Sequence, residues 1–333
     1  MTHATSLFLL LASTTFSLAI GEFGLGLLFH KDILIASTQT DYVKPYYWQP
    51  SDLGFQAPPG RHTSKKITSD GEVVYDVTYT IGEDGFRVTP QSDSDIHIRV
   101  NFFGCSLLFG EGLNDNETLP YFLHVLDNSI TVKNFAWHGY GVHQALRILV
   151  SPRDTRGDIN FLLTAPWHAE RAACVPDYSN GSPRYRLVDD GELILDGTCG
   201  FPFEKNNMIY GALGRSRLYH LVRYALKETQ DRQVDLYLAI IRRINDLSQA
   251  RNQRFIVGFI KADDQWFTGT YSNGKIVSKL SGMGIEVVDV TLSKSARDIP
   301  REYYIHPLDQ HPSAKANEAR AKILREYIQR VDP

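Results

Sequence analysis

The feature that most constrains the fold is an alternation of short apolar runs with amphipathic segments along the last two-thirds of the chain. Each run has the length of a strand and little polar alternation, which is typical of strands covered on both faces. The runs are 96–103, 130–136, 158–164, 255–261 and 285–290. Apolar residues at helical spacing lie between most of them and again over 316–331. The alternation predicts an α/β fold with a parallel sheet and helices on both faces.

A serine follows the first of these strands. The strand ends at Gly104, and Cys105 and Ser106 open the next predicted helix. Ligands of open α/β sheets bind at the carboxyl ends of the strands, and a helix N-terminus offers unpaired N–H groups that favour negative charge. A hydroxyl beside such a site is what acyl transfer needs. The alternative is a Gly-Cys-Ser turn that only caps a helix.

Partners for this serine lie in two later segments. A nucleophilic serine needs a base, and the base needs an orienting group. Asp309 and His311 precede the final helix, in the loop after the last strand, so we expect His311 to reach Ser106 and Asp309 to hold its other nitrogen. Gly139 follows the second strand, and its N–H is a candidate oxyanion donor beside that of Ser106. The alternatives are a polar helix cap and a simple chain turn.

Together these segments resemble the SGNH (GDSL-like) hydrolases, and in particular their membrane-anchored bacterial members. The matching motifs are Gly104-Cys-Ser106, Phe109-Gly-Glu-Gly-Leu113 with Glu117-Thr-Leu-Pro120, His138-Gly-Tyr-Gly141 and Asp309-Gln-His-Pro312. The resemblance covers residues 95–331 and implies a flavodoxin-like three-layer sandwich with a five-stranded parallel sheet. It also implies that Ser106 is the nucleophile and that His311 and Asp309 complete a triad.

The sequence departs from the family pattern at two places. Gly-Cys-Ser stands where the namesake motif has Gly-Asp-Ser, which leaves the serine in place. The third block of the family usually offers an Asn side chain to the oxyanion, but residues 165–171 contain no Asn. We expect His168 to take that role or to contact the substrate. Otherwise one donor is lost, which typically lowers the rate by about 10²–10³-fold.

The first thirty residues form a separate apolar segment. No charge lies between Ala4 and Gly21, and apolar character continues beyond Glu22 to Phe29. This length suits the roughly 20 residues that cross a bilayer and exceeds the about 7–15 of a signal-peptide core. We predict a signal anchor or transmembrane helix at 1–30. The protein would be single-pass in the cell inner membrane, with its catalytic domain on the periplasmic or extracytoplasmic side. The alternative is an apolar helix packed on the domain.

The rest of the chain divides into two parts. Residues 31–94 are rich in loop signals, with a strand at 73–80 and a turn after it, and we predict a linker with a small β-hairpin. Residues 95–333 form the hydrolase-like domain. A β-hairpin insertion interrupts that domain at about 174–210. Two cysteines, Cys174 and Cys199, flank the insertion and are candidates for a disulfide in an exported domain.

Charge and motifs exclude other classes of protein. The net charge is −3, without the basic excess that indicates nucleic-acid binding. The glycine patterns of P-loop and Rossmann proteins are absent after the first strand, and Leu108 replaces the last glycine of a Gly-x-Ser-x-Gly elbow. His138 and His143 lack a recognised metal-ligand spacing. We therefore expect no nucleic-acid partner, metal or cofactor.

We predict a serine esterase or deacylase that acts on an O-acyl ester of a glycan or a lipid. An exported, tethered domain with aromatic flanks suits O-acylated glycans of the cell envelope. Two alternatives remain open. The same residues can pass the acyl group to another hydroxyl, which would make the protein an O-acyltransferase. A catalytically silent glycan-binding or envelope-assembly module is the other, and the missing Asn favours it.

Overall fold

The computed structural model describes most of the chain as two compact units. The described residues are 40–44, 49–90, 97–188, 191–200 and 228–331, with isolated positions between 13 and 24 and at 216 and 218. One unit comprises residues 1–38 and 201–227, and the main unit comprises residues 39–200 and 228–333. The candidate site lies within the main unit. The predicted boundaries at residues 30 and 94 stay predictions.

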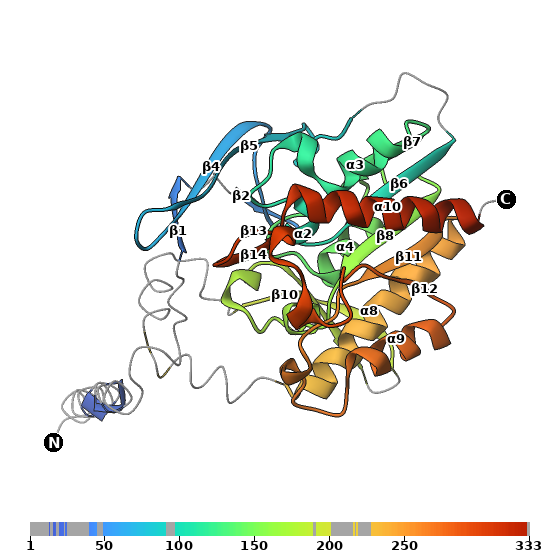
Figure 1. The fold of residues 1–333 in the computed structure, drawn as a ribbon. Helices are drawn as coiled ribbons and strands as arrows, with labels where there is room; N and C mark the ends of the chain where they lie inside the picture. Colours follow the sequence, from blue (N-terminus) through green and yellow to red (C-terminus); the bar gives the residue numbers. More distant parts are fainter. Residues whose placement is uncertain are drawn as a thin grey trace. The chain divides into compact units, whose positions relative to one another are not determined.

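The main unit is built on a five-stranded parallel sheet (Figure 1). Its strands are β6 (Ile98–Phe103), β7 (Ile130–Asn134), β8 (Ile159–Thr164), β11 (Arg254–Phe259) and β12 (Glu286–Asp289). Their order in space is β7-β6-β8-β11-β12, which is the order of flavodoxin-like doubly wound sheets. The central strand β8 is buried along its whole length. The predicted α/β fold with a five-stranded parallel sheet is confirmed.

Helices cover both faces of this sheet. They are α2 (Ser106–Phe109), α3 (Leu119–Leu126), α4 (Val142–Val150), α5 (His168–Ala172), α8 (Gln230–Ala250), α9 (Asn273–Gly282) and α10 (Ala314–Val331). Crossovers between parallel strands are right-handed. The chain moves one way across the sheet from β6 to β7 and the other way from β7 to β8, so the helices of these two connections lie on opposite faces. Accordingly α10 packs on α3, whereas α8 packs on α4 and α5. Short 3₁₀ helices occupy Asp115–Glu117, Asp177–Ser179, Asp264–Trp266, Ala296–Asp298 and Arg301–Tyr303.

A three-stranded antiparallel sheet precedes the parallel one. Its strands are β1 (Thr40–Lys44), β4 (Gly60–Thr68) and β5 (Val73–Ile81), and a small hairpin joins β2 (Gln49–Ser51) to β3 (Gly54–Gln56). The sequence prediction of a strand at 73–80 is correct, and the partner expected after the turn is reduced to a single antiparallel bridge between Ile81 and Arg87. The long partner of β5 is β4, which lies within the segment that the sequence indicated as a linker. No apolar pattern marks β4 in the sequence, because it contains charged residues such as Lys65 and Lys66. Only its pairing with β5 defines it as a strand.

The predicted β-hairpin insertion is present. It consists of β9 (Pro183–Leu187) and β10 (Leu193–Thr198), which pair antiparallel. A disulfide joins Cys174 to Cys199 at the base of the hairpin, with their Cα atoms 5.3 Å apart. The last part of the predicted insertion, residues 201–210, lies outside the described residues. The remaining cysteine, Cys105, is free and buried.

The predicted membrane anchor is not supported. Among the residues that the structure describes, no helix is both long enough and apolar enough to cross a bilayer. Crossing takes roughly 20 predominantly apolar residues, and the long helices α8 and α10 carry charged residues along their length. This finding contradicts the predicted single-pass location in the inner membrane. Much of the segment 1–30 lies outside the described residues. Its Glu22 accepts hydrogen bonds from Ser216 Oγ and Leu218 N, at 2.9 and 3.1 Å.

A buried arginine ties the chain after β5 to the loop after α2. The side chain of Arg87 is fully buried, and its Nη1 donates to the carbonyls of Phe109 and Gly110, at 2.7 and 2.8 Å. Its Nη2 donates to Leu113 O at 2.6 Å, and its Nε pairs with Asp115 at 2.9 Å. Burial lowers the pKa of Arg87, and Asp115 opposes that effect. One side chain therefore fixes the backbone of 109–115, which borders the candidate site.

Replacing Arg87 with Met should lower the free energy of unfolding by about 3 kcal/mol, because it leaves buried carbonyls without donors. Urea unfolding followed by circular dichroism measures the loss. Arg156→Met is the matched control, because Arg156 is exposed and pairs with the nearby surface residue Asp154. We expect no measurable change there. Equal losses in the two variants would contradict a structural role specific to Arg87.

Candidate active site

The three residues predicted to act together meet at the carboxyl edge of the parallel sheet. Ser106 is the first residue of α2, and only Gly104 and Cys105 separate it from the end of β6. Asp309 and His311 lie on β14 (Asp309–Pro312), which pairs with β13 (Tyr304–His306). The sequence predicted a loop here. The structure instead has a short strand, and α10 begins at Ala314.

A continuous chain of hydrogen bonds links these three side chains. His311 Nε2 lies 2.9 Å from Ser106 Oγ, and His311 Nδ1 lies 2.5 Å from Asp309 Oδ1. The same carboxylate oxygen accepts the backbone N–H of His311 at 3.1 Å, which fixes the turn between the two residues. The order carboxylate, imidazole, hydroxyl is the arrangement of a nucleophile with an oriented base.

A lysine that the sequence did not single out holds the far side of Asp309. Lys66 comes from β4, and its Nζ lies 2.6 Å from Asp309 Oδ2. Burial would raise the pKa of Asp309, but the hydrogen bonds from His311 and Lys66 outweigh it and lower the pKa to about 2. Asp309 is therefore ionised at neutral pH. No local signal marked Lys66, since it lies in the segment that resembled a linker.

A second carboxylate also faces the imidazole. Glu111 follows α2 and is only 4% exposed, and its Oε2 lies 3.2 Å from His311 Nε2. The same oxygen lies 2.6 Å from His138 Nδ1, and Tyr75 donates its hydroxyl to Oε1 at 3.3 Å. The sequence placed Glu111 within the matching motif after Ser106 without giving it a role. The signal was a carboxylate between two glycines, in the turn that follows the helix opened by the predicted nucleophile.

The electrostatics of His311 reflect these neighbours. Burial favours the neutral ring, but the charge of Glu111 and the hydrogen bond and charge of Asp309 outweigh it, so the pKa of His311 is raised. The imidazolium is therefore stabilised at the point where it would form during proton transfer from Ser106.

Gly139 lies in the loop that follows β7, beside the end of β6. The loop is fixed there because Trp137 N donates to Gly104 O at 3.3 Å. Gly139 has φ +70°, and a Cβ atom would lie 3.0 Å from the ring of Tyr178. Both observations explain why a glycine occupies this position. Its role as an oxyanion donor stays a prediction.

The structure places His168 where it has no N–H to offer an oxyanion. Its ring is 1% exposed, Nε2 accepts from Arg171 Nη1 at 3.2 Å, and Nδ1 lies 3.0 Å from Thr164 Oγ1. Burial and the charge of Arg171 keep the pKa of His168 well below its usual value, so the ring is neutral. A neutral imidazole carries one N–H. Because Nε2 accepts from Arg171, this N–H is at Nδ1 and donates to Thr164 Oγ1. We therefore leave His168 out of the proposed oxyanion site.

One group in the described part of the chain has donor atoms close enough to hold a metal ion. It comprises Glu111, Asp309 and His311, whose ligand atoms lie within 4.8 Å of one another. Lys66 lies 2.6 Å from Asp309 and 3.9 Å from Glu111, so an ammonium group already supplies positive charge there. The cluster is better suited to moving a proton than to binding a cation. His138 and His143 do not form a metal group with each other among the described residues.

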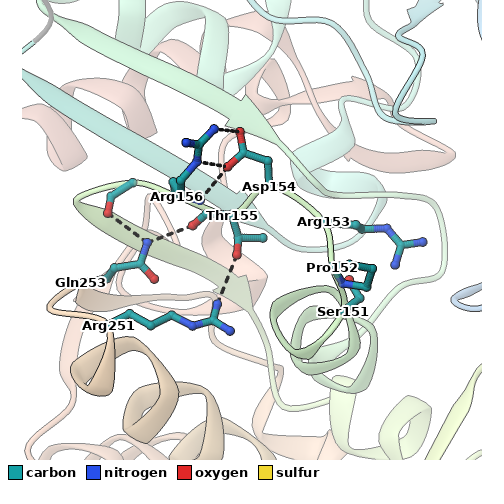
Figure 2. Close-up of a pocket in the computed structure, with 9 residues that line it drawn as sticks. Ser151, Pro152, Arg153, Asp154, Thr155, Arg156, Arg251 and Gln253 are labelled. Carbon is teal, nitrogen blue, oxygen red and sulfur yellow. Dashed lines mark hydrogen bonds and ion pairs between the residues drawn. The ribbon is translucent and has the colours of Figure 1, made fainter.

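A separate hollow lies at the amino ends of β8 and β11 (Figure 2). It is lined by residues 151–157 with Arg251 and Gln253. Its arginines already have partners, since Arg156 pairs with Asp154 and Arg251 donates to Thr155 (Figure 2). Ser106 lies past the carboxyl end of β6, at the opposite edge of the parallel sheet, so this hollow is not part of the candidate site.

Comparison with known proteins gives structural neighbours only. No protein-family model matches this sequence, and no curated protein matches it at a significant level. A member of the lipolytic protein G-D-S-L family from Veillonella parvula is 13% identical, with 70% of this chain and 98% of that one covered and a TM-score of 0.40. The psychrotrophic esterase EstA from Pseudoalteromonas sp. is 12% identical, with 70% and 97% covered and a TM-score of 0.41. A GDSL-like lipase from Bacteroides thetaiotaomicron is also 12% identical, with 70% and 88% covered and a TM-score of 0.38. All three of these neighbours have TM-scores below 0.5.

Proposed function

We propose that this chain is an ester hydrolase of the SGNH (GDSL-like) type. Ser106 is the nucleophile, His311 the general base and Asp309 the group that orients the imidazole. The observation that carries this proposal is the hydrogen-bonded line from Asp309 through His311 to Ser106, built from residues more than 200 positions apart in the chain. It lies at the carboxyl edge of a parallel sheet, where such folds place their chemistry.

The proposed reaction follows from this geometry. Ser106 Oγ attacks the ester carbonyl while His311 Nε2 takes the hydroxyl proton. The N–H groups of Ser106 and Gly139 stabilise the oxyanion, and the imidazolium then protonates the departing alcohol. Water, deprotonated by the same nitrogen, attacks the acyl-enzyme, and the imidazolium returns the proton to Ser106 Oγ as the bond to the acyl group breaks and the acid leaves. Asp309 stays ionised throughout, because its pKa of about 2 lies far below neutral pH.

The substrate class proposed is an O-acyl ester. The glycan substrate predicted from the sequence depended on a membrane-tethered location, and it loses that support. Acyl transfer to a second alcohol would use the same residues, and no feature of the described site selects such an acceptor over water. The hydrogen bond between Ser106 and His311 favours a catalytic site over a catalytically silent binding module.

A fluorophosphonate probe and two ester classes test the proposal. We expect the purified protein to hydrolyse short p-nitrophenyl esters with saturation kinetics and to take up one probe molecule per chain at Ser106. Acetate release from an acetylated glycan, measured in parallel, tests the envelope-glycan substrate. A protein that takes up no probe and cleaves neither ester would refute the hydrolase proposal.

A further inference from the structure

We propose that Glu111 is a positioning residue that holds the ring of His311 between two carboxylates and sets the pH below which the base is blocked. This inference rests on the proposed function, since it assigns a role within the same site. It goes further because the expected triad has one carboxylate, on the far side of the ring. Here a second carboxylate faces the nitrogen that must accept the serine proton.

His311 Nε2 lies within hydrogen-bond distance of two oxygen atoms, so a proton on this nitrogen would be donated to both. Ser106 Oγ lies 2.9 Å away and Glu111 Oε2 lies 3.2 Å away. A neutral ring with its proton on Nδ1 has a lone pair at Nε2, which a carboxylate oxygen would repel. A doubly protonated ring donates from Nε2 to both oxygens. The resting arrangement therefore fits an imidazolium between Asp309 and Glu111.

Several contacts keep Glu111 in this place. The oxygen that faces His311 also lies 2.6 Å from His138 Nδ1, and Tyr75 donates to the other oxygen. Gly110 and Gly112, on either side of Glu111, both have positive φ. A Cβ at Gly112 would lie 2.6 Å from the side chain of Ile305 and 2.9 Å from the ring of Tyr75, so a glycine fits this close approach. The carboxylate is thus held by side chains and by its backbone, and it cannot turn away from the imidazole without breaking them.

The charges around His311 favour its protonated form. Besides Tyr75 of β5, which donates to Glu111, four ionisable groups of the described residues lie close to the ring or to its carboxylates. They are Asp309 on the same strand, Glu111 after α2, Lys66 from β4 and His138 after β7. On the adjoining strand β13, His306 pairs instead with Glu72, at 3.5 Å. Two carboxylates against one ammonium leave a net negative environment, and the raised pKa of His311 agrees with it.

This arrangement has two consequences for the proposed reaction. At low pH the proton on Nε2 must leave to solvent before His311 can accept one from Ser106, so Glu111 moves the onset of activity to higher pH. Once Ser106 has given its proton to Nε2 and attacked, Glu111 stabilises the resulting imidazolium. That proton then passes to the leaving alcohol, and the carboxylate of Glu111 ends the cycle unchanged.

The first test is the pH dependence of kcat/KM for Glu111→Gln, measured on a p-nitrophenyl ester whose hydrolysis Ser106→Ala abolishes. An opposite charge within about 4–6 Å shifts a pKa by about 1–3 units, so the acid limb should move down by about 1 pH unit or more. Glu117→Gln is the matched control, because Glu117 follows on the same segment and its carboxylate accepts the backbone N–H of Asn114 instead. Its limb should not move. Activity that falls equally at every pH in Glu111→Gln, with the limb unmoved, would reduce Glu111 to a scaffold residue and overturn the proposal.

The second test does not depend on activity. In the Ser106→Ala protein, the His311 ring signal is identified by NMR from its loss on further change of His311 to Gln, and is followed through a pH titration. We expect a midpoint above the ordinary value of about 6.5, which drops when Glu111→Gln is added. A midpoint at or below about 6.5 with Glu111 present would overturn the proposal even if Glu111→Gln did not fold. If no ester is cleaved by the unaltered protein, the proposed function fails while this titration still decides the role of Glu111.

Discussion

Replacing Ser106 with Ala is expected to abolish ester hydrolysis, with a fall in kcat of about 10⁴-fold or more. The variant keeps the fold, because the serine side chain is small and its one bond in the site is to His311 Nε2. It removes the atom that forms the acyl-enzyme, so the remaining rate is that of water attack aided only by binding and oxyanion donors. The measurements are steady-state hydrolysis of a p-nitrophenyl ester and labelling by a fluorophosphonate probe.

Cys105→Ala is the control for this prediction. Cys105 immediately precedes Ser106 and is the other nucleophilic side chain of the turn, but it is buried and free of any disulfide. We expect its alanine variant to keep both activity and labelling. If the cysteine variant lost the label and the serine variant kept it, the assignment of the nucleophile would have to change.

Changing Asp309 to Asn should lower kcat by about 10⁴-fold. An amide at this position can donate its N–H to His311 Nδ1, which moves the ring proton to Nε2 and removes the lone pair that accepts the serine proton. Lys66 also loses the carboxylate that lies 2.6 Å from its Nζ. The measurement is kcat and KM at the pH optimum, with thermal unfolding to show that the fold persists.

A matched carboxylate far from the site serves as control for that change. Asp154 pairs with Arg156 and Lys133 at the surface, so Asp154→Asn should leave kcat unchanged. An Asp309→Asn enzyme within about 10-fold of the normal rate would mean that the imidazole does not depend on this carboxylate for its tautomer.

The positions of the parallel strands and of the residues after them could be predicted from the sequence. Runs such as 158–164 are apolar throughout, and a strand buried on both faces has no other composition available to it. The topological rule for such sheets then places Ser106, Gly139 and His311 at one edge without knowledge of any distance. The hydrogen bonds between Ser106, His311 and Asp309 agree with that expectation.

Other predictions rested on a local sequence pattern, whereas contacts between distant parts of the chain decided the outcome. The strand β4 is rich in charged residues and became visible only through its pairing with β5. The histidine of the third block, His168, was matched to a family position, but Arg171 and Thr164 already occupy its ring nitrogens. The apolar character of residues 1–30 suggested an anchor, but no helix among the described residues is long and apolar enough to cross a membrane.

By itself, the sequence determined the fold class and the three residues of the proposed triad, because periodicity, glycine placement and motif order are properties of neighbouring positions. Only the tertiary structure decided that Lys66 contacts Asp309 and that Glu111 faces the reacting nitrogen of His311. These contacts join β4, the loop after α2 and β14. Their physical cause is the packing of an antiparallel sheet and a glycine-flanked loop against one edge of the parallel sheet, and no spacing along the chain encodes it.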